Sequence, residues 1–270
     1  GAFKEDMEAI KKAGENKKFL PGFKIPKSIQ LTSEIYTACE GANIITLAIP
    51  SRFLRDVITK NKTILKESQV GFVSVVKGIE EKSLKRMSEI AREVLGDIEI
   101  AVLSGPSIAP EVSRGIPTAV VVASEDEIFA RKVSDIFRAE RFRVYTNKDV
   151  IGVELGGAFK NIIAIASGIS DGLGFGANTK AAILTRGLIE MTRLGLAMGG
   201  SRDTFQGLSG LGDMMTTCVS SEGRNHRFGE DIGKGNKPEL LLNKSVMEIE
   251  GAWTSAAAVE LGKIYNIELP

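Results

Sequence analysis

The chain has 270 residues, 43% of them hydrophobic, and a formal net charge of +1, which predicts a soluble globular protein of one large or two ordinary domains. The balanced charge provides no overall attraction for nucleic acid, and no apolar run approaches the ~20 residues that a membrane span needs. Two cysteines, Cys39 and Cys218, and one histidine, His226, exclude a disulfide framework, a four-cysteine zinc site and a histidine-based nucleophile, so we expect a reduced, cytoplasmic protein without a metal.

The first half of the chain alternates strand-length and helical patterns. Its opening residues, GAFKEDMEAIKK, are charged and helix-like, unlike a signal peptide or a membrane anchor. β-Branched runs then predict five strands, at residues 43–50, 70–76, 98–105, 118–124 and 142–147. Apolar faces predict helices over 83–95 and 125–138, the second opened by a capping box of Ser124 and Glu127. This alternation predicts an α/β domain with a doubly wound parallel sheet, covered by helices on both faces.

Two turns after predicted strands could present free backbone N–H groups to an anion. One offers Ser51 as a helix cap, and the other contains Ser104, Gly105 and Ser107. A dinucleotide-binding sheet should also carry G-x-G-x-x-G after its first strand, and no such motif follows a predicted strand here. Either the sheet does not bind a dinucleotide, or the domain lacks its first βαβ unit of ~30 residues.

After Asp149 the pattern is helical throughout. The longest helical runs are VIGVELGGAFKNIIAIASGI and TKAAILTRGLIEMTRLGLAMG, and shorter ones cover 222–233 and 253–265. The glycine-containing stretch GISDGLGFG is predicted to be a loop, and His226 to lie on the surface beside arginines. The sequence therefore predicts a sheet domain over 1–147 and a helical domain over 148–270, with a ligand crevice at their junction.

Three charged residues stand alone in otherwise apolar or neutral runs: Lys160, Lys77 and Asp213. A buried ammonium must be paired, reach water in a cleft or take part in chemistry, because an unpaired buried charge costs several kcal/mol. Burial also lowers a lysine pKa from its usual ~10.4, which makes the neutral amine available as a base. The three residues could line one polar pocket; alternatively, each could cap an element or extend its charged end into water.

The chain closely resembles the bacterial NAD(P)-dependent glycerol-3-phosphate dehydrogenases in four runs: VSVVKGIE, AVLSGPSIAPEVSRGIPTAVVVAS, GVELGGAFKNIIAIASGISDGLG and GLGDMMTTCVSSEGRNHRFG. The resemblance implies a Rossmann-type domain for NAD or NADP followed by an all-helical domain that completes the substrate site. It also implies interconversion of sn-glycerol 3-phosphate and dihydroxyacetone phosphate for phospholipid synthesis, in a cytoplasmic homodimer.

The same resemblance assigns roles to individual residues. Lys160 matches the proton acceptor, and Lys77 and Asp213 match residues that assist it. The positions that match substrate contacts are Lys77, Gly105, Ser107, Asn161, Asp213, Thr217, Gly223, Arg224 and Asn225. The positions that match cofactor contacts are Lys77, Ala109, Arg224 and Glu250. Arg224 and Asn225 are expected near the substrate phosphate, because a guanidinium offers paired donors to phosphate oxygens.

The chain also departs from the family pattern. Relative to the family it is expected to begin after the second strand and to stop before the last helices, and Gly223 replaces a serine. Two other functions are compatible with the sequence. One is a two-domain dehydrogenase for a different hydroxy acid, and the other is a binding fragment that has lost catalysis.

Overall fold

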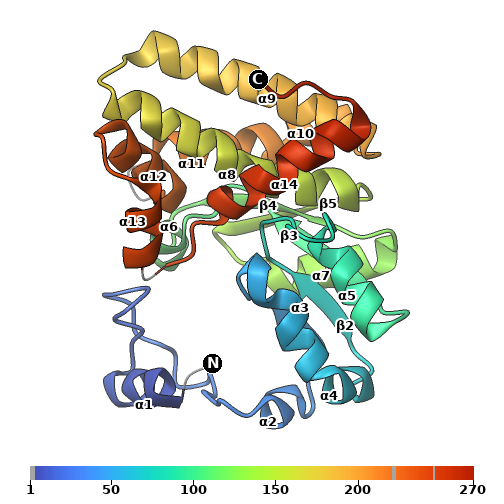
Figure 1. Cartoon of the computed structure of the whole chain (residues 1–270). Coiled ribbons are helices and arrows are strands. Elements are labelled where there is room, and N and C mark those ends of the chain that lie inside the picture. Colours follow the sequence, from blue (N-terminus) through green and yellow to red (C-terminus); the bar gives the residue numbers. More distant parts are fainter. Residues whose placement is uncertain (1–3, 221–222, 246) are drawn as a thin grey trace.

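The structure is a computed structural model in which residues 4–220, 223–245 and 247–270 are described. Its sheet contains five strands in the order β1-β2-β3-β4-β5, which confirms the five predicted strands. They are β1 (Ile44–Leu47), β2 (Gly71–Ser74), β3 (Ile100–Ser104), β4 (Thr118–Ala123) and β5 (Phe142–Asn147). Figure 1 shows this sheet in the lower half of the molecule, beneath a layer of helices from the second half of the chain.

The sheet is mostly parallel, as predicted, but one pair differs. β1 pairs with β2, β2 with β3 and β4 with β5 in parallel, whereas β3 and β4 are antiparallel, with Val102 opposite Ala123. A parallel pair needs a crossover of about a dozen residues or more, usually a helix that covers the sheet. The connection from β3 to β4 carries only the five-residue helix α6 (Ala109–Ser113), so β4 returns along its neighbour. The carboxyl ends of β1, β2 and β3 therefore share one edge.

Helices cover both faces of the sheet, because successive strand residues point to opposite sides. Phe72 of β2 packs in one apolar cluster with Leu54 and Ile90, while its neighbour Val73 packs in another with Phe129. The helices of this half are α1 (Lys4–Ala13), α2 (Ile35–Cys39), α3 (Ser51–Lys60), α4 (Lys62–Glu67), α5 (Met87–Leu95), α6 and α7 (Glu127–Phe137). The continuous apolar character of the strands thus results from burial on both faces.

The predicted helices over 83–95 and 125–138 are present as α5 and α7, but the predicted caps are wrong. Asp126 caps α7, because its carboxylate accepts the backbone N–H groups of Ile128 and Phe129. The hydroxyl of Ser124 instead donates to the carbonyl of Ile100. Ser51 is the first residue of α3, not its cap, and its side chain bonds across to the second half of the chain.

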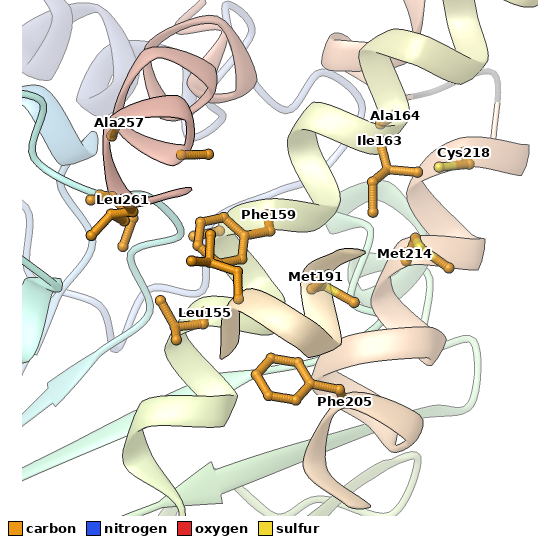
Figure 2. Packing of buried hydrophobic residues seen from close by; sticks show 14 residues of the cluster. Leu155, Phe159, Ile163, Ala164, Met191, Phe205, Met214, Cys218, Ala257 and Leu261 are labelled. Carbon is orange, nitrogen blue, oxygen red and sulfur yellow. The ribbon is translucent and has the colours of Figure 1, made fainter. Parts of the chain in front are cut away.

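The second half is helical, as predicted, and is built around α8 (Val150–Gly172). It also contains α9 (Ala177–Ala197), α10 (Arg202–Gln206), a π-helical turn η1 (Leu208–Gly212), α11 (Asp213–Val219), α12 (Arg224–Gly233), α13 (Pro238–Lys244) and α14 (Glu250–Tyr265). Figure 2 shows Leu155 and Phe159 of α8 packed among side chains of its neighbours, including Phe205 and Leu261. The first part of the predicted GISDGLGFG loop belongs to α8, which ends at Gly172.

Within the described residues, α8 is the one helix long and apolar enough to cross a membrane by length and composition. The sequence predicted no apolar run of membrane-spanning length. That prediction missed α8 because Glu154 and Lys160 interrupt the apolar residues of this helix. In the structure, 72% of its apolar window is buried inside the protein. Such burial is typical of the core helix of a globular domain.

Candidate active site

The candidate site lies where the carboxyl edge of β1, β2 and β3 meets α8 and α11. Lys77 follows β2 and Gly105 follows β3, so the shared direction of these strands places both at one edge. Lys160 lies in the middle of α8, and Asp213 begins α11 directly after the π-helical turn. Irregular helical turns of this kind are frequent at functional sites.

Glycines allow these elements to approach closely. A Cβ atom on Gly157 of α8 would lie 2.6 Å from the hydroxyl of Ser104 and 3.4 Å from Cγ of Lys77. Gly105 has φ +133°, a conformation that favours glycine, and a Cβ there would lie 3.0 Å from Cα of Val120. The glycines of LGGAFKN and SGPS therefore bring α8 against the sheet edge.

The three isolated charges predicted from the sequence lie together. Nζ of Lys160 donates to Oδ1 of Asp213 at 2.7 Å and to the hydroxyl of Thr217 at 2.6 Å. Nζ of Lys77 donates to Oδ2 of the same carboxylate and to the carbonyl of Gly105 at 3.1 Å. One carboxylate thus bridges two ammonium groups that come from different halves of the chain.

Burial governs the electrostatics of this cluster. Lys160 is 7% exposed, and loss of solvation lowers its pKa to about 8, although the Asp213 carboxylate acts in the opposite direction. Burial acts to raise the pKa of Asp213, but the ammonium groups of Lys160 and Lys77 outweigh it and hold that pKa below its usual value. Asp213 therefore stays ionised while Lys160 can exchange a proton near neutral pH. Burial raises the pKa of the nearby Cys218 to about 12, so its thiol is not a nucleophile.

A chain of side-chain amides joins this cluster to the start of α12. The amide of Asn161 donates to the carbonyl of Lys77 at 3.5 Å, and the amide of Asn225 donates to Oδ1 of Asn161 at 3.0 Å. The carbonyl oxygen of Asn225 accepts from the backbone N–H of Gly251 at 2.9 Å. Asn225 is buried and follows Arg224, an exposed residue that begins α12. The network links the first turn of α12, which carries Arg224, to Lys77 through Asn225 and Asn161.

Other predicted site residues lie at the rim of this network. The hydroxyl of Ser107 donates to the carbonyl of Gly105 at 3.0 Å. Ala109 is exposed at the start of α6, and Gly223 is the N-cap of α12. In the part of the chain that the structure describes, Ala109, Gly223 and Arg224 make no side-chain hydrogen bond to the cluster.

Glu250 belongs to a second contact between the two halves. Its Oε1 accepts the backbone N–H of Ser51 at 3.0 Å, and Oε2 accepts the hydroxyl of Ser51. Burial raises the pKa of Glu250, while the bonds from Ser51 and the nearby Arg224 oppose the shift. The carboxylate therefore occupies the N-terminus of α3, at the same edge of the sheet as Lys77.

These residues provide donors and acceptors of the kind that the amide, hydroxyl and phosphate groups of a dinucleotide use. A carboxylate has room for about four hydrogen bonds, so Glu250 retains acceptor capacity beyond Ser51 for a hydroxyl or an amide. Lys77 and the exposed Arg224 add donors near it, while the sequence has no G-x-G-x-x-G turn after a strand for a pyrophosphate. Among residues 4–220, 223–245 and 247–270, no group of three or more His, Cys, Asp or Glu side chains could hold a metal ion.

Two features differ from the sequence-based expectation or were missed by it. His226 was predicted to lie on the surface, and this is wrong: it is 7% exposed and its Nε2 lies 2.7 Å from Oδ2 of Asp171. The buried Glu154 of α8 was missed; it accepts from the backbone N–H and hydroxyl of Ser88 at 2.8 and 2.6 Å and pairs with Arg86 at 2.6 Å. The sequence pattern that indicated a buried Lys160, a single charged residue in an apolar run, also applies to Glu154.

Comparisons with known proteins agree with this arrangement. Residues 149–270 match the sequence family described as NAD-dependent glycerol-3-phosphate dehydrogenase C-terminus, and residues 2–130 match the corresponding N-terminus family. Glycerol-3-phosphate dehydrogenase [NAD(P)+] of Pelotomaculum thermopropionicum is 47% identical over 272 residues, covering 100% of this chain and 78% of that protein. The enzyme of the same name from Halothermothrix orenii is 48% identical, covering 97% of this chain and 77% of its own. The crystal structure of glycerol-3-phosphate dehydrogenase from Coxiella burnetii superposes with a TM-score of 0.95 at 36% identity, covering 100% of this chain and 82% of its own.

Proposed function

The chain belongs to the NAD-dependent glycerol-3-phosphate dehydrogenase family, and we propose that it interconverts sn-glycerol 3-phosphate and dihydroxyacetone phosphate with NAD or NADP. The observation that supports this most is the carboxylate of Asp213 held between the ammonium groups of Lys160 and Lys77. The reaction requires a group that exchanges a proton with the C2 oxygen, and this cluster contains one with a pKa of about 8.

The residues divide the chemistry between them. A bound nicotinamide cofactor would supply the hydride transfer at C2 of the substrate, in either direction. Lys160 takes the proton of the C2 hydroxyl during oxidation and returns it during reduction. Asp213 remains ionised and orients Nζ of Lys160, with Thr217 as its second acceptor. Lys77 and Asn161 donate to the C2 oxygen and stabilise the negative charge that develops there.

The phosphate is bound at the start of α12. Arg224 and the free N–H groups of the ten-residue helix favour a dianion, and Asn225 supports them through Asn161. Gly105, Ser107 and Gly223 add backbone or hydroxyl contacts to the substrate at the rim. The cofactor is held by Lys77, Ala109, Arg224 and Glu250, of which Glu250 bridges the two halves through Ser51.

We further propose a division into a cofactor domain over 1–147 and a substrate domain over 148–270, in a cytoplasmic homodimer that supplies glycerol 3-phosphate for phospholipid synthesis. Several large apolar side chains are exposed in the helical half, which supports subunit association: Leu173, Phe175, Val259 and Ile264. Sedimentation velocity at several protein concentrations tests this, and a monomer throughout would contradict the dimer.

A substrate panel tests the activity itself. Purified protein is assayed for NADH and NADPH oxidation with dihydroxyacetone phosphate and, as the matched control, with dihydroxyacetone. We expect turnover with dihydroxyacetone phosphate and a kcat/KM at least about a hundredfold lower with dihydroxyacetone. Dihydroxyacetone lacks the phosphate and therefore cannot form the charge-assisted hydrogen bonds of the phosphate site. Equal rates with both compounds, or turnover with neither, would contradict the proposal.

A further inference from the structure

A partly buried polar cluster that the proposed chemistry does not use joins three helices of the second half. His226 of α12 approaches Asp171 at the end of α8, with 2.7 Å between Nε2 and Oδ2. The same oxygen accepts from Nζ of Lys180 in the first turn of α9 at 2.7 Å. Burial acts to raise the pKa of Asp171, but the bonds from Lys180 and His226 outweigh it and lower that pKa. The carboxylate is therefore ionised and available as an acceptor.

The contacts of the His226 side chain indicate which of its ring nitrogens carries a proton. Nδ1 of His226 is buried and has no hydrogen-bond partner within the described residues. An ionised carboxylate can only accept hydrogen bonds, so the contact with Asp171 requires a proton on Nε2 of His226. The geometry therefore has Nε2–H donating to Asp171.

The position of His226 in α12 connects this bond to the proposed phosphate site. Arg224, Asn225 and His226 are consecutive and form the first turn of the helix. From this turn, Asn225 reaches Asn161 in the candidate site, and His226 reaches Asp171 near the end of α8. The two side chains thus attach the turn to α8 at two separate points.

The helices α8 and α12 also meet along a close backbone contact. A Cβ on Gly168 of α8 would collide with the carbonyl of His226, and one on Gly229 of α12 would collide with the carbonyl of Ile165. These glycines fix which face of α12 meets α8 and how closely the two helices approach. Among the described residues, the side-chain hydrogen bonds that join α12 to α8 come from Asn225 and His226, both in the first turn.

We propose that His226 is a positioning residue for recognition of the substrate phosphate. Its hydrogen bond to Asp171 fixes the rotation of the first turn of α12, and with it the directions of Arg224 and the N-terminal N–H groups. This role rests on the proposed function, because it requires that the phosphate bind at this turn. It differs from a general structural role, because Lys160 and Asp213 lie on α8 and α11 and keep their own contacts when this bond is lost.

Steady-state kinetics of paired variants test the role. His226→Phe removes the donor but keeps a ring, whereas His226→Gln retains an N–H at a similar reach. We expect His226→Phe to raise the KM for dihydroxyacetone phosphate about tenfold, with kcat within about threefold and the KM for NADH raised by no more than about threefold, since Arg224 also contacts the cofactor. His226→Gln should recover most of the loss. The double variant His226→Phe with Asp171→Ala should raise the KM for dihydroxyacetone phosphate no more than the more severe single variant does. Both substitutions remove the same hydrogen bond, so their effects should not add.

Lys180→Gln is the matched control, since it removes the other partner of Asp171 and should leave the KM for dihydroxyacetone phosphate unchanged. An unchanged KM in His226→Phe, or equal losses in kcat and in both KM values, would overturn the proposed role. Wild-type protein that fails to reduce dihydroxyacetone phosphate would instead overturn the proposed function.

A measurement on the unmodified chain guards against variants that fail to fold. His226 is the only histidine, so its ring nitrogens give the only histidine side-chain signals in a ¹⁵N spectrum. We expect a ring protonated at Nε2, whose signals shift when glycerol 3-phosphate is added and stay in place with glycerol. Ring signals unchanged by glycerol 3-phosphate in protein that binds it would overturn the coupling between His226 and the phosphate.

Discussion

Lys160 and Asp213 lie 53 residues apart in the sequence, yet their side chains form a buried ion pair at 2.7 Å. The same carboxylate binds Lys77 from the sheet half. The pair matters for chemistry because burial without Asp213 would lower the pKa of Lys160 further and leave its charge unsupported.

The first prediction concerns pH. In the oxidation direction Lys160 must be neutral to accept a proton, so kcat/KM should rise with pH through about 8. In the reduction direction the ammonium must donate, so the rate should fall as pH rises through the same value. Asp213→Asn removes the carboxylate that raises the pKa of Lys160, and should move both inflections to lower pH. The exposed Asp135→Asn is the control, and an inflection that Asp213→Asn leaves in place would contradict the account.

The second prediction concerns the phosphate. Arg224→Ala should raise the KM for dihydroxyacetone phosphate about tenfold to a hundredfold, because one charge-assisted pair of hydrogen bonds is lost. Arg227→Ala removes an exposed arginine from the same helix and should change the KM little. Equal effects in the two variants would mean that only the overall charge of α12 matters.

The third prediction concerns the cofactor. Glu250→Gln should raise the KM for NADH or NADPH about tenfold, because an amide accepts the bonds of Ser51 less well than a carboxylate and alters the acceptor offered to the cofactor. The exposed Glu260→Gln in the same helix is the matched control. Fluorescence titration of NADH measures the affinity directly, and unchanged binding would remove Glu250 from the cofactor site.

The fourth prediction concerns stability. Glu154→Ala leaves Arg86 and the first turn of α5 without their buried acceptor and should lower the free energy of unfolding by about 3–5 kcal/mol. The double variant Arg86→Met with Glu154→Leu should recover part of that loss, because no unpaired charge remains. Glu89→Ala removes the exposed partner of Arg86 and the acceptor of its backbone N–H, and should cost only about 1–2 kcal/mol. Urea denaturation gives these values, and similar losses for Glu154→Ala and Glu89→Ala would contradict the buried role.

The strands and long helices were predictable because their apolar patterns reflect burial, as for Phe72 and Val73 on opposite faces of β2. The antiparallel pairing of β4 was not, since it depends on a short connection and not on the pattern of the strand itself. Similarly, the capping box of Ser124 failed because the helix begins two residues later, where Asp126 accepts the N–H groups of Ile128 and Phe129. Sequence spacing alone does not decide between such neighbours.

The isolated charges of the site were visible in the sequence, but their partners were not. The runs around Lys160 and Asp213 indicated burial, whereas the bridge between two lysines depends on the close approach of α8 to the sheet at Gly157. His226 was misplaced because its neighbours are exposed arginines, while it lies on the side of α12 that meets α8 together with Gly229.

The most direct test of the account is the turnover of Lys160→Ala, measured by steady-state and single-turnover kinetics with dihydroxyacetone phosphate and NADH. The exposed Lys132→Ala is the control, and the melting temperature and glycerol 3-phosphate affinity of both variants are measured alongside. We expect Lys160→Ala to lose about a thousandfold in kcat or more, as for removal of a general acid or base, while substrate binding is partly retained. Steady-state and single-turnover rates near those of the wild type would contradict the role of Lys160 as the proton acceptor.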